Sequence, residues 1–344
     1  MNRKIGLKDI AAKVGVSTAL VSYVLNNKKE GRINKSVAAK IREVATDLNY
    51  RTNQIAKSLK TNKTFTIGLI IGNIANPFFS GLARIIEDEA EVHNYTVLFG
   101  SSDENPLRTQ KLVDTFIDRQ VDGIILAPGE NNADLVLSLQ RQRIPFVLVD
   151  RYLPNINTSY VALDNFQASG MAIHHLVQCG YQRIGMITFK TPMHHLEQRR
   201  QGYMDALAKE GILFNKDWLV NISTNHEKKN VEQALDRLLS LPEPVDAILF
   251  ATNAIATHGL KHINYLQVKV PDQLALISFD KTDALDLFYA PLTVIEQPLA
   301  EMGQLATKTL INLIEGSTTV AQYNLPAHLM VRASTCQQQP AGIL

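Results

Sequence analysis

The pattern in residues 7–25 limits what this chain can fold into more than any other feature, because it is typical of two short helices joined by a tight turn. Ala11 and Gly15 stand where two such helices approach closely and turn. Asn34 is placed to cap a third helix. We therefore expect a small all-α helix-turn-helix head over residues 1–50, with a core formed by Ile10, Val14, Val16, Val21 and Val24.

The charge of the chain is unevenly divided along its length. Residues 1–63 carry 14 Lys and Arg against 4 Asp and Glu, a net of +10, and the remaining residues carry 21 against 29, a net of −8. A basic head of this kind suits a polyanion, and its binding should weaken with salt because counterions leave the phosphates. A solvated basic face is the alternative for a charge run, but here the charges lie on a helix-turn-helix pattern. The head is therefore predicted to bind double-stranded DNA.

One face of the second helix, at about residues 18–26, is predicted to enter a major groove. Ser17 is placed to cap this helix and to leave its first backbone N–H groups available to a phosphate. Tyr23 either reads bases together with Thr18 and Ala19 or packs on the surface of the domain. The exposed face as a whole is expected to consist of Thr18, Ala19, Ser22, Tyr23 and Asn26.

Residues 53–60 are predicted to form a hinge helix that orders only against something else. A segment of about eight residues is too short for a stable isolated helix, because nucleation is costly. Ile55 and Leu59 lie one turn apart, so two protomers could pair them across a twofold axis while Leu59 wedges into a minor groove. An ordinary linker is the alternative interpretation of this segment.

The first 64 residues resemble the lactose/galactose repressor family (LacI/GalR), and the similarity continues almost to the C-terminus. The matching stretches are LKDIAAKVGVST, VSYVLN, LNYRTNQIAKSLKTNKTFTIGLII, NPFF, RQVDGIILAP, RRQGY, VPDQLALISFD and PLTVIEQPLAEMGQLA. The resemblance implies a dimeric transcription factor, most simply a repressor, whose hinge helices fold on a palindromic operator. Thr52 replaces the proline usual in the family, and Leu20 and Tyr23 also depart from commoner residues, so the operator sequence is not predicted.

Four parts follow from this organisation: a head over residues 1–50, a hinge and linker over 51–64, a body over 65–334 and a tail over 335–344. The residues expected to contact DNA lie in the head and the hinge, and they are Ser17, Thr18, Ala19, Ser22, Tyr23, Asn26, Asn53, Ile55, Ala56, Leu59 and Lys60.

Apolar runs alternate with amphipathic helical stretches throughout the body. The runs are TIGLII, TVLFG, GIILA, FVLVD, IGMITF, AILFA and ALISF, and the helical stretches include residues 78–93 and 227–239. This alternation predicts an α/β, two-lobed, periplasmic-binding-protein-like body in which parallel sheets are flanked by helices. Neither GxGxxG nor GxxxxGK[ST] is present, so the sheets are not expected to serve a dinucleotide or a nucleoside triphosphate.

Polar and aromatic residues follow several of these strands. Ligands of open parallel sheets bind at the carboxyl ends of the strands, which face the cleft of a two-lobed protein. Phe78 and Phe79 follow the first strand, where they are either core or a flat wall for a ligand. Asp150 and Asp280 follow FVLV and ALISF. These positions are therefore candidates for a ligand site.

The family resemblance sharpens this set. Its effector sites imply Arg199 in R-x-x-G, Asn253 after the AILFAT strand, Asp280 in S-F-D and Gln297 in the closing strand. For a polyhydroxylated ligand such as a sugar, Asp280 would accept hydroxyl protons and Arg199 would donate in a planar fork, the alternative being an interlobe salt bridge. The expected effector-binding residues are Phe78, Phe79, Asp150, His195, Arg199, Asn253, Asp280 and Gln297. Ala254 replaces an aspartate common in the family, which removes one carboxylate.

No catalytic or metal constellation is evident. The adjacent histidines His174-His175 and His194-His195 would point in different directions on a helix, and no HExxH, CxxC or G-x-S-x-G pattern occurs. We therefore expect no cofactor, no metal and no enzymatic activity. A DNA-binding head fused to a hydrolase or transferase remains a weaker alternative.

The two cysteines, the lack of an apolar leader after Met1 and the lack of an apolar run near 18 residues predict a cytoplasmic protein with no membrane segment. One recognition helix covers only a half-site, so we expect a homodimer, and residues after Arg332 lack the heptads of a tetramerising coiled coil. The other open interpretation is a body that binds a protein partner or only dimerises.

Overall fold

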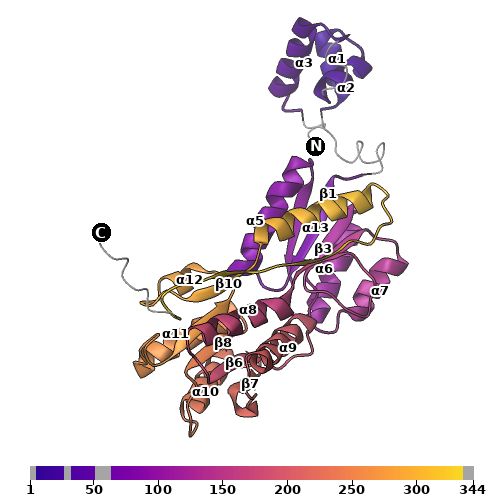
Figure 1. Cartoon of the computed structure of the whole chain (residues 1–344). Coiled ribbons are helices and arrows are strands. Elements are labelled where there is room, and N and C mark those ends of the chain that lie inside the picture. The colour runs from indigo at the N-terminus through magenta and orange to yellow at the C-terminus, as the bar shows by residue number, and fades with distance from the viewer. Residues whose placement is uncertain (1–4, 27–31, 51–62, 336–344) are drawn as a thin grey trace. The chain divides into compact units, whose positions relative to one another are not determined.

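A small helical domain forms the described part of the first unit of the chain. The computed structural model describes residues 5–26, 32–50 and 63–335, and the chain divides into the units Met1–Thr64 and Phe65–Leu344. The first unit contains α1 (Leu7–Val14), α2 (Thr18–Leu25) and α3 (Lys35–Asp47), the indigo helices of Figure 1. The helix-turn-helix prediction is therefore confirmed.

The three helices pack around a core of short apolar side chains. Ile10, Val21 and Ile41 come from α1, α2 and α3 and are fully buried. Leu20, one of the departures from the family pattern, is half-buried against this core. A domain this small buries little apolar surface, so each of these side chains carries a large share of its stability.

Lobe 1 of the second unit is an α/β layer structure around a parallel sheet. Its strands are β1 (Thr66–Ile71), β2 (Thr96–Ser101), β3 (Gly123–Leu126), β4 (Phe146–Asp150), β5 (Tyr160–Leu163) and β11 (Gln322–Leu325), in the order β11-β5-β4-β3-β1-β2. One face packs against α5 (Pro77–Val92) and α13 (Leu299–Ile314). The other packs against α6 (Pro106–Asp118) and α7 (Ala133–Arg141). Both faces are thus covered, which explains the unbroken apolar runs of the strands.

Lobe 2 repeats this architecture. Its strands are β6 (Ile184–Phe189), β7 (Leu219–Ile222), β8 (Ala247–Phe250), β9 (Ala275–Phe279), β10 (Thr293–Glu296) and β12 (His328–Met330), in the order β12-β10-β9-β8-β6-β7. The helices α8 (Asn165–Gln178) and α9 (His194–Lys209) cover one face. The opposite face is covered by α10 (Glu227–Leu239), α11 (Asn253–Leu266) and α12 (Asp283–Asp286), and the 3-10 turn η2 (Lys216–Trp218) precedes β7. Parallel sheets flanked by helices are confirmed, with β12 as an antiparallel edge strand that was not predicted.

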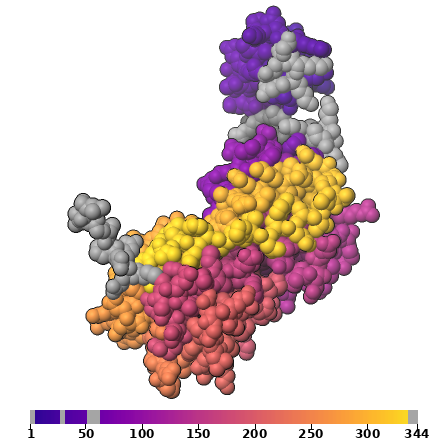
Figure 2. Space-filling view, in the orientation of Figure 1, coloured from indigo at the N-terminus to yellow at the C-terminus, as the bar shows by residue number. Residues whose placement is uncertain are grey.

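The chain crosses between the lobes three times, after β5, after β10 and after β11. The last two crossings make α13 and β11 part of lobe 1 although they follow lobe 2 in sequence. Figure 2 shows this C-terminal yellow segment extending over both lobes on the face in view. Ser334 and Thr335 are fully buried in lobe 2. Thr335, predicted to begin the tail, therefore belongs to the body, because its hydroxyl hydrogen bonds with that of Thr293 at 2.7 Å.

Strand order makes the two lobes equivalent. Reading inward from one edge, lobe 1 runs β2-β1-β3-β4-β5 and lobe 2 runs β7-β6-β8-β9-β10. The strands β4 and β9 therefore occupy the same place in their sheets. Residues that follow these two strands lie at matching carboxyl ends, where open α/β sheets bind ligands.

Candidate functional site

The turn between α1 and α2 determines where the second helix begins. Gly15 ends α1 with a φ of 80°, a left-handed conformation that glycine adopts without strain. Ser17 is extended, and its Oγ accepts the backbone N–H of Leu20 at 3.2 Å. The capping role predicted for Ser17 is confirmed.

The exposed face of α2 is narrower than predicted. Ser17, Thr18 and Ala19 are exposed and Tyr23 is 37% exposed. Ser22 and Asn26 are half-buried, because Asn26 ends the helix and its Nδ2 donates to the backbone oxygen of Ser22 at 2.8 Å. The first turn of the helix, together with Tyr23, is thus the part most available to a partner.

The hinge residues of the prediction lie outside the described residues. They are Asn53, Ile55, Ala56, Leu59 and Lys60. Their proposed contacts with DNA stay predictions.

In the second unit, β4 and β9 each lead into an aspartate with the same unusual backbone. Asp150 has a φ of 66° and Asp280 a φ of 67°, and both are buried, at 6% and 8% exposure. Positive φ costs a residue with a side chain of order 1 kcal/mol, least for Asn, Asp and glycine. Other non-glycine residues of the described chain also have positive φ, so what distinguishes this pair is their burial at matching strand ends.

Asp280 is held by hydrogen bonds from its own lobe. Its Oδ1 accepts Nε2 of Gln297 at 2.6 Å, and its carboxylate also accepts the backbone N–H of Asn253, the first residue of α11. Burial raises the pKa of Asp280, and the charge of Arg199 and these hydrogen bonds oppose that rise. The carboxylate is therefore fixed in place before any ligand arrives.

Arg199 is buried beside Asp280 and is also fixed. Its Nε donates to Oδ1 of Asn165 at 2.7 Å, and its Nη1 donates to the carbonyl of Ala251 at 2.6 Å. The guanidinium lies 3.7 Å from the centre of the Phe279 ring, a cation–π contact. Burial lowers its pKa, and the nearby carboxylates raise it. The alternative interpretation of these two residues, an interlobe salt bridge, is not what the structure has, because Arg199 on α9 and Asp280 after β9 both belong to lobe 2. Their use by a ligand stays a prediction.

Asp150 belongs to a chain of charges that sequence analysis missed in part. The Arg151 Nε lies 3.3 Å from Oδ2 of Asp150. Both terminal nitrogens of Arg151 bind the two carboxylate oxygens of Glu104, at 2.7 and 2.9 Å. Burial raises the pKa of Asp150 to about 6, although Arg151 and Arg199 lower it. We call Glu104, Asp150, Arg151, Arg199 and Asp280 the polar cluster.

Gly72 makes room for the Glu104 side chain, and Gly129 borders it at ordinary contact distance. A Cβ at Gly72 would lie 2.2 Å from Oε1 of Glu104, and one at Gly129 would lie 3.5 Å from Oε2. These glycines follow β1 and β3, which separate β2 from β4 in the sheet. Small residues at the ends of intervening strands, between opposite charges, are the sequence signal that would have indicated this ion pair.

His195 and Asn253 lie at the same junction. Burial lowers the pKa of His195 well below its ordinary value, with Arg151 and Arg199 contributing, so the ring is neutral. Asn253 Nδ2 donates to Oδ1 of Asn76 at 2.9 Å and so joins lobe 2 to lobe 1. Nε of Arg151, Nδ1 of His195 and Oε1 of Gln297 are buried here with no hydrogen-bond partner among the described residues.

Phe78 and Phe79 pack in the core of lobe 1. They are 6% and 3% exposed and contact each other edge to face, with ring centres 5.2 Å apart. The ring of Phe79 also lies 5.4 Å from the Arg151 guanidinium. Of the two, Phe79 is the one that borders the polar cluster.

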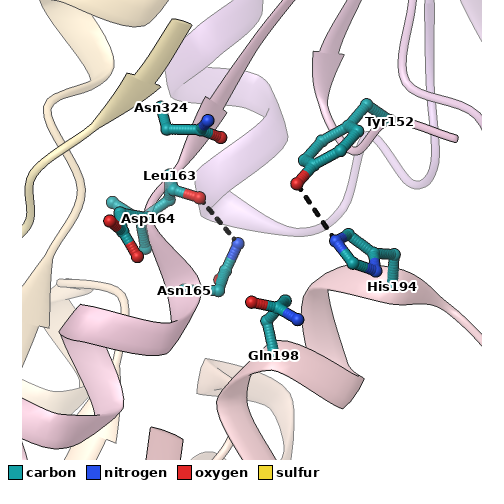
Figure 3. Close-up of a pocket in the computed structure, with 7 residues that line it drawn as sticks. All are labelled: Tyr152, Leu163, Asp164, Asn165, His194, Gln198 and Asn324. Atoms are coloured by element: carbon teal, nitrogen blue, oxygen red, sulfur yellow. Dashed lines mark hydrogen bonds between the residues drawn. The ribbon is translucent and has the colours of Figure 1, made fainter. Parts of the chain in front are cut away.

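A pocket of about 190 Å³ opens beside the cluster (Figure 3). Its lining comes from both lobes and from the crossing segments, and it consists of Tyr152, Leu163, Asp164, Asn165, His194, Gln198 and Asn324. The Tyr152 hydroxyl and Nε2 of His194 hydrogen bond at 3.0 Å across the lobes. Asn165 joins the pocket to the cluster, since it also binds Arg199. Asp150, Arg199 and Asp280 are buried, whereas the Glu104 side chain is 44% exposed. None of these residues lines the pocket, which therefore adjoins the cluster.

Within residues 5–26, 32–50 and 63–335, no three His, Cys, Asp or Glu side chains are grouped so that they could hold a metal ion. None of the helices in those ranges is both long and apolar enough to span a membrane.

Comparisons with known proteins agree on one family. The sequence model described as "Bacterial regulatory proteins, lacI family" matches residues 6–53, and that described as "Periplasmic binding protein-like domain" matches residues 173–335. The HTH-type transcriptional repressor CytR of Escherichia coli (strain K12) is 30% identical over 330 residues, 96% of each chain. The ribose operon repressor of Halalkalibacterium halodurans is 29% identical over 330 residues, again 96% of each.

The fold has solved counterparts. The crystal structure of the Lac repressor dimer bound to operator and the anti-inducer ONPF is similar with a TM-score of 0.84 and 20% identity, over 97% of this chain and 100% of that chain. At this identity the likeness speaks for the fold alone.

Proposed function

The chain belongs to the lacI family of bacterial regulatory proteins, and on that premise we propose that it is a repressor whose operator binding is controlled by a sugar or sugar derivative held between its lobes. Relatives in this family are DNA-binding transcriptional regulators and not enzymes. The observation that carries the effector half of the proposal is the polar cluster, in which each lobe contributes a buried aspartate from a matching strand end. Burying a charged side chain destabilises the folded state unless the charge is paired, and buried charges are often found where a protein binds a ligand.

The DNA half of the proposal rests on α2. Thr18, Ala19 and Tyr23 are the exposed side chains of this capped helix that would reach base edges in a major groove, and Ser17 with the first N–H groups would contact a phosphate. Two copies of the chain would read the two halves of a palindromic operator as a homodimer. The proposal assigns the protein to the cytoplasm, where that DNA lies.

The effector half assigns roles to individual side chains. Asp280 and Asp150 would accept hydroxyl protons, Arg199 would donate to a ring or hydroxyl oxygen, and the unpartnered atoms of His195 and Gln297 would be satisfied by the ligand. Asn253 and Phe79 would border it. A relative named for the ribose operon supports a sugar as the ligand class.

Ligand binding would act on DNA through the relation between the lobes. A ligand that contacts both strand ends favours one arrangement of the lobes over others by its differential affinity. The paired hinge segments of a dimer would then fold on DNA or fail to fold.

The first test is selection of binding sites from random-sequence DNA by the full chain. We expect recovery of a palindrome, and a pool without any twofold-symmetric site would contradict the proposal. Thr18→Ala should weaken binding to the recovered site by about 1–3 kcal/mol. Thr46→Ala, at an exposed threonine of α3, is the matched control and should bind like the unaltered protein.

The second test asks whether a ligand controls that binding. Titration of sugars into the complex with the recovered site should change operator affinity, and Arg199→Ala should abolish the change. If no compound of a broad carbohydrate library alters DNA binding, the body serves a protein partner or dimerisation instead.

A further inference from the structure

The polar cluster contains more carboxylates than guanidinium groups. Glu104, Asp150 and Asp280 are acidic, Arg151 and Arg199 are basic, and the neighbouring His195 is held neutral by burial. A ligand that enters the cluster therefore meets a surplus of negative charge, and its own charge decides whether it is attracted or repelled.

Neither arginine has both of its terminal nitrogens free to clamp an anion, although Nη2 of Arg199 can still donate to a single ligand oxygen. Arg199 uses Nε and Nη1 on Asn165 and Ala251 and its face on Phe279. Both terminal nitrogens of Arg151 donate to Glu104, and its Nε lies at ion-pair distance, 3.3 Å, from Oδ2 of Asp150 without a hydrogen-bond partner among the described residues. Fork-shaped recognition of a phosphate needs two free N–H groups side by side, and Glu104 already occupies that fork of Arg151.

The basic residues next in sequence to the cluster are paired as well. Arg200 forms an ion pair with Glu197 and also donates to the carbonyl of Phe189. Lys281 lies 3.4 Å from Glu296. Each of these cations has a carboxylate of its own.

Most of the side-chain groups of the polar cluster and the adjoining pocket that could contact a ligand are hydrogen-bond acceptors. Oε1 of Gln297 is buried and unpartnered among the described residues, and the carboxylates of Asp150 and Asp280 add further acceptors. The adjoining pocket in Figure 3 has one carboxylate, Asp164, three amide side chains and no Lys or Arg in its lining. Hydroxyl groups supply donors to such a surface, whereas a phosphate or carboxylate at neutral pH brings only acceptors and negative charge.

We infer that the cleft ligand is an uncharged polyhydroxylated compound, and that Glu104 excludes the phosphorylated and acidic forms of that compound by occupying Arg151. This inference rests on the proposed effector role of the cluster. It narrows the ligand to free sugars and their neutral glycosides, nucleosides included.

Thermal unfolding of the full chain with matched pairs of compounds tests the inference. The pairs are pentoses and hexoses with their phosphates and uronic acids, and nucleosides with their monophosphates. At least one neutral compound should raise Tm by several degrees while its charged partner leaves Tm unchanged. A charged compound that stabilises the protein as much as its neutral parent, or a panel in which no neutral compound stabilises, overturns the inference.

Glu104→Gln isolates the cause of the discrimination. This variant removes the negative charge and one of the two oxygens that accept from Arg151, without changing the size of the side chain. The charged partner of the best neutral ligand should therefore gain at least about tenfold in affinity relative to that ligand. Glu87→Gln, which removes an exposed carboxylate paired with Arg84 on α5, is the control and should leave the ratio unchanged. A ratio that Glu104→Gln leaves unchanged assigns the discrimination to other residues and overturns the role of Glu104.

The outcome is separable from that of the proposed function. Selection from random DNA and operator binding do not depend on which ligand binds. Failure to recover an operator would contradict the proposed function as a DNA-binding regulator. Stabilisation by a phosphorylated compound, with operator binding intact, would contradict only the inference that the ligand is uncharged.

Discussion

The two lobes carry the same aspartate at the same strand end, yet they surround it differently. Asp280 in lobe 2 accepts hydrogen bonds from Gln297 and from the first backbone N–H of α11. Asp150 in lobe 1 has only the Arg151 Nε, at 3.3 Å, and Arg151 is itself shared with Glu104. The two lobes therefore share their strand order and the backbone conformation of the aspartate, but they differ in the hydrogen bonds that the aspartate accepts.

This difference indicates a division of labour within the cleft. Lobe 2 offers a carboxylate that is already oriented, as a preorganised binding site requires. Lobe 1 offers one whose burial is poorly compensated, so its pKa is raised to about 6. In the proposed effector site, a ligand hydroxyl that donates to Asp150 would offset the cost of burying this carboxylate. A ligand that contacts Asp280 as well would then favour an arrangement in which the two lobes are close together.

The largest effect is expected at Arg199, which compensates both aspartates. Arg199→Ala leaves two buried carboxylates without their shared cation and should destabilise the protein by about 3–5 kcal/mol at pH 7. Arg84→Ala, at a largely exposed arginine, should cost less than about 1 kcal/mol. Urea unfolding of both variants measures the difference, and equal stabilities would mean that the aspartates do not depend on Arg199.

Replacing each aspartate by asparagine tests the comparison directly. Asparagine tolerates positive φ, so the backbone is not strained further. Asp150→Asn should stabilise the protein by about 2 kcal/mol at pH 7, because it removes a poorly compensated buried charge. Asp280→Asn should destabilise it by about 1–3 kcal/mol, because its new amide faces a backbone N–H. Changes of the same sign in denaturant melts would refute the division of labour.

The stabilisation by Asp150→Asn should depend on pH in a defined window. The Asp150 carboxyl has a pKa of about 6 in the folded protein, against an ordinary value of 3.8 for an aspartate in the unfolded chain. Between these two pH values the folded state therefore binds more protons than the unfolded state. The contribution of Asp150 to the free energy of unfolding then falls as pH rises from about 4 to about 6, and it is constant above that pH. The advantage of Asp150→Asn should be absent at pH 4 and full at pH 7. A constant advantage across this range would contradict the assignment.

The smallest effect is expected at the bond between the Tyr152 hydroxyl and His194, which joins the lobes. Tyr152→Phe keeps the stacking on Tyr160, whose ring centre lies 4.0 Å away, and removes the hydroxyl that bonds to His194 and also interacts with Tyr160. We expect a loss of about 0.5–1.5 kcal/mol in unfolding free energy. Tyr323→Phe on β11, which likewise removes only a hydroxyl group, is the control, and an equal or larger loss there would show that the effect is not specific to the bond between Tyr152 and His194.

Local patterns were sufficient for much of the architecture. The caps at Ser17 and Asn34 and the glycine at position 15 follow from short-range backbone chemistry, and the structure has them where they were predicted. Seven apolar runs became strands because both faces of each sheet are covered. The short strands β5, β7, β11 and β12 were not identified, because three or four residues carry little periodicity.

Side-chain surroundings were harder to predict than elements. Ser22 and Asn26 were expected to be exposed on α2, but the helix ends at Leu25 and Asn26 folds back onto Ser22. Arg151 and Glu104 are 47 positions apart and follow strands that are not neighbours in the sheet. Their pairing uses the space beside Gly72, and the meaning of that glycine becomes clear only once the order of the strands in the sheet is known.

The amino-acid sequence by itself determined the helical head, the paired α/β lobes and the aspartates at two strand ends, because these depend on periodicity, capping and strand-end chemistry that act over a few residues. Only the tertiary structure decided that Asp280 accepts hydrogen bonds from its own lobe while Asp150 does not, and that Glu104 forms a two-bond ion pair with Arg151. Long-range packing sets which charges become neighbours and how much water they lose, and those two quantities govern what a buried charge can bind.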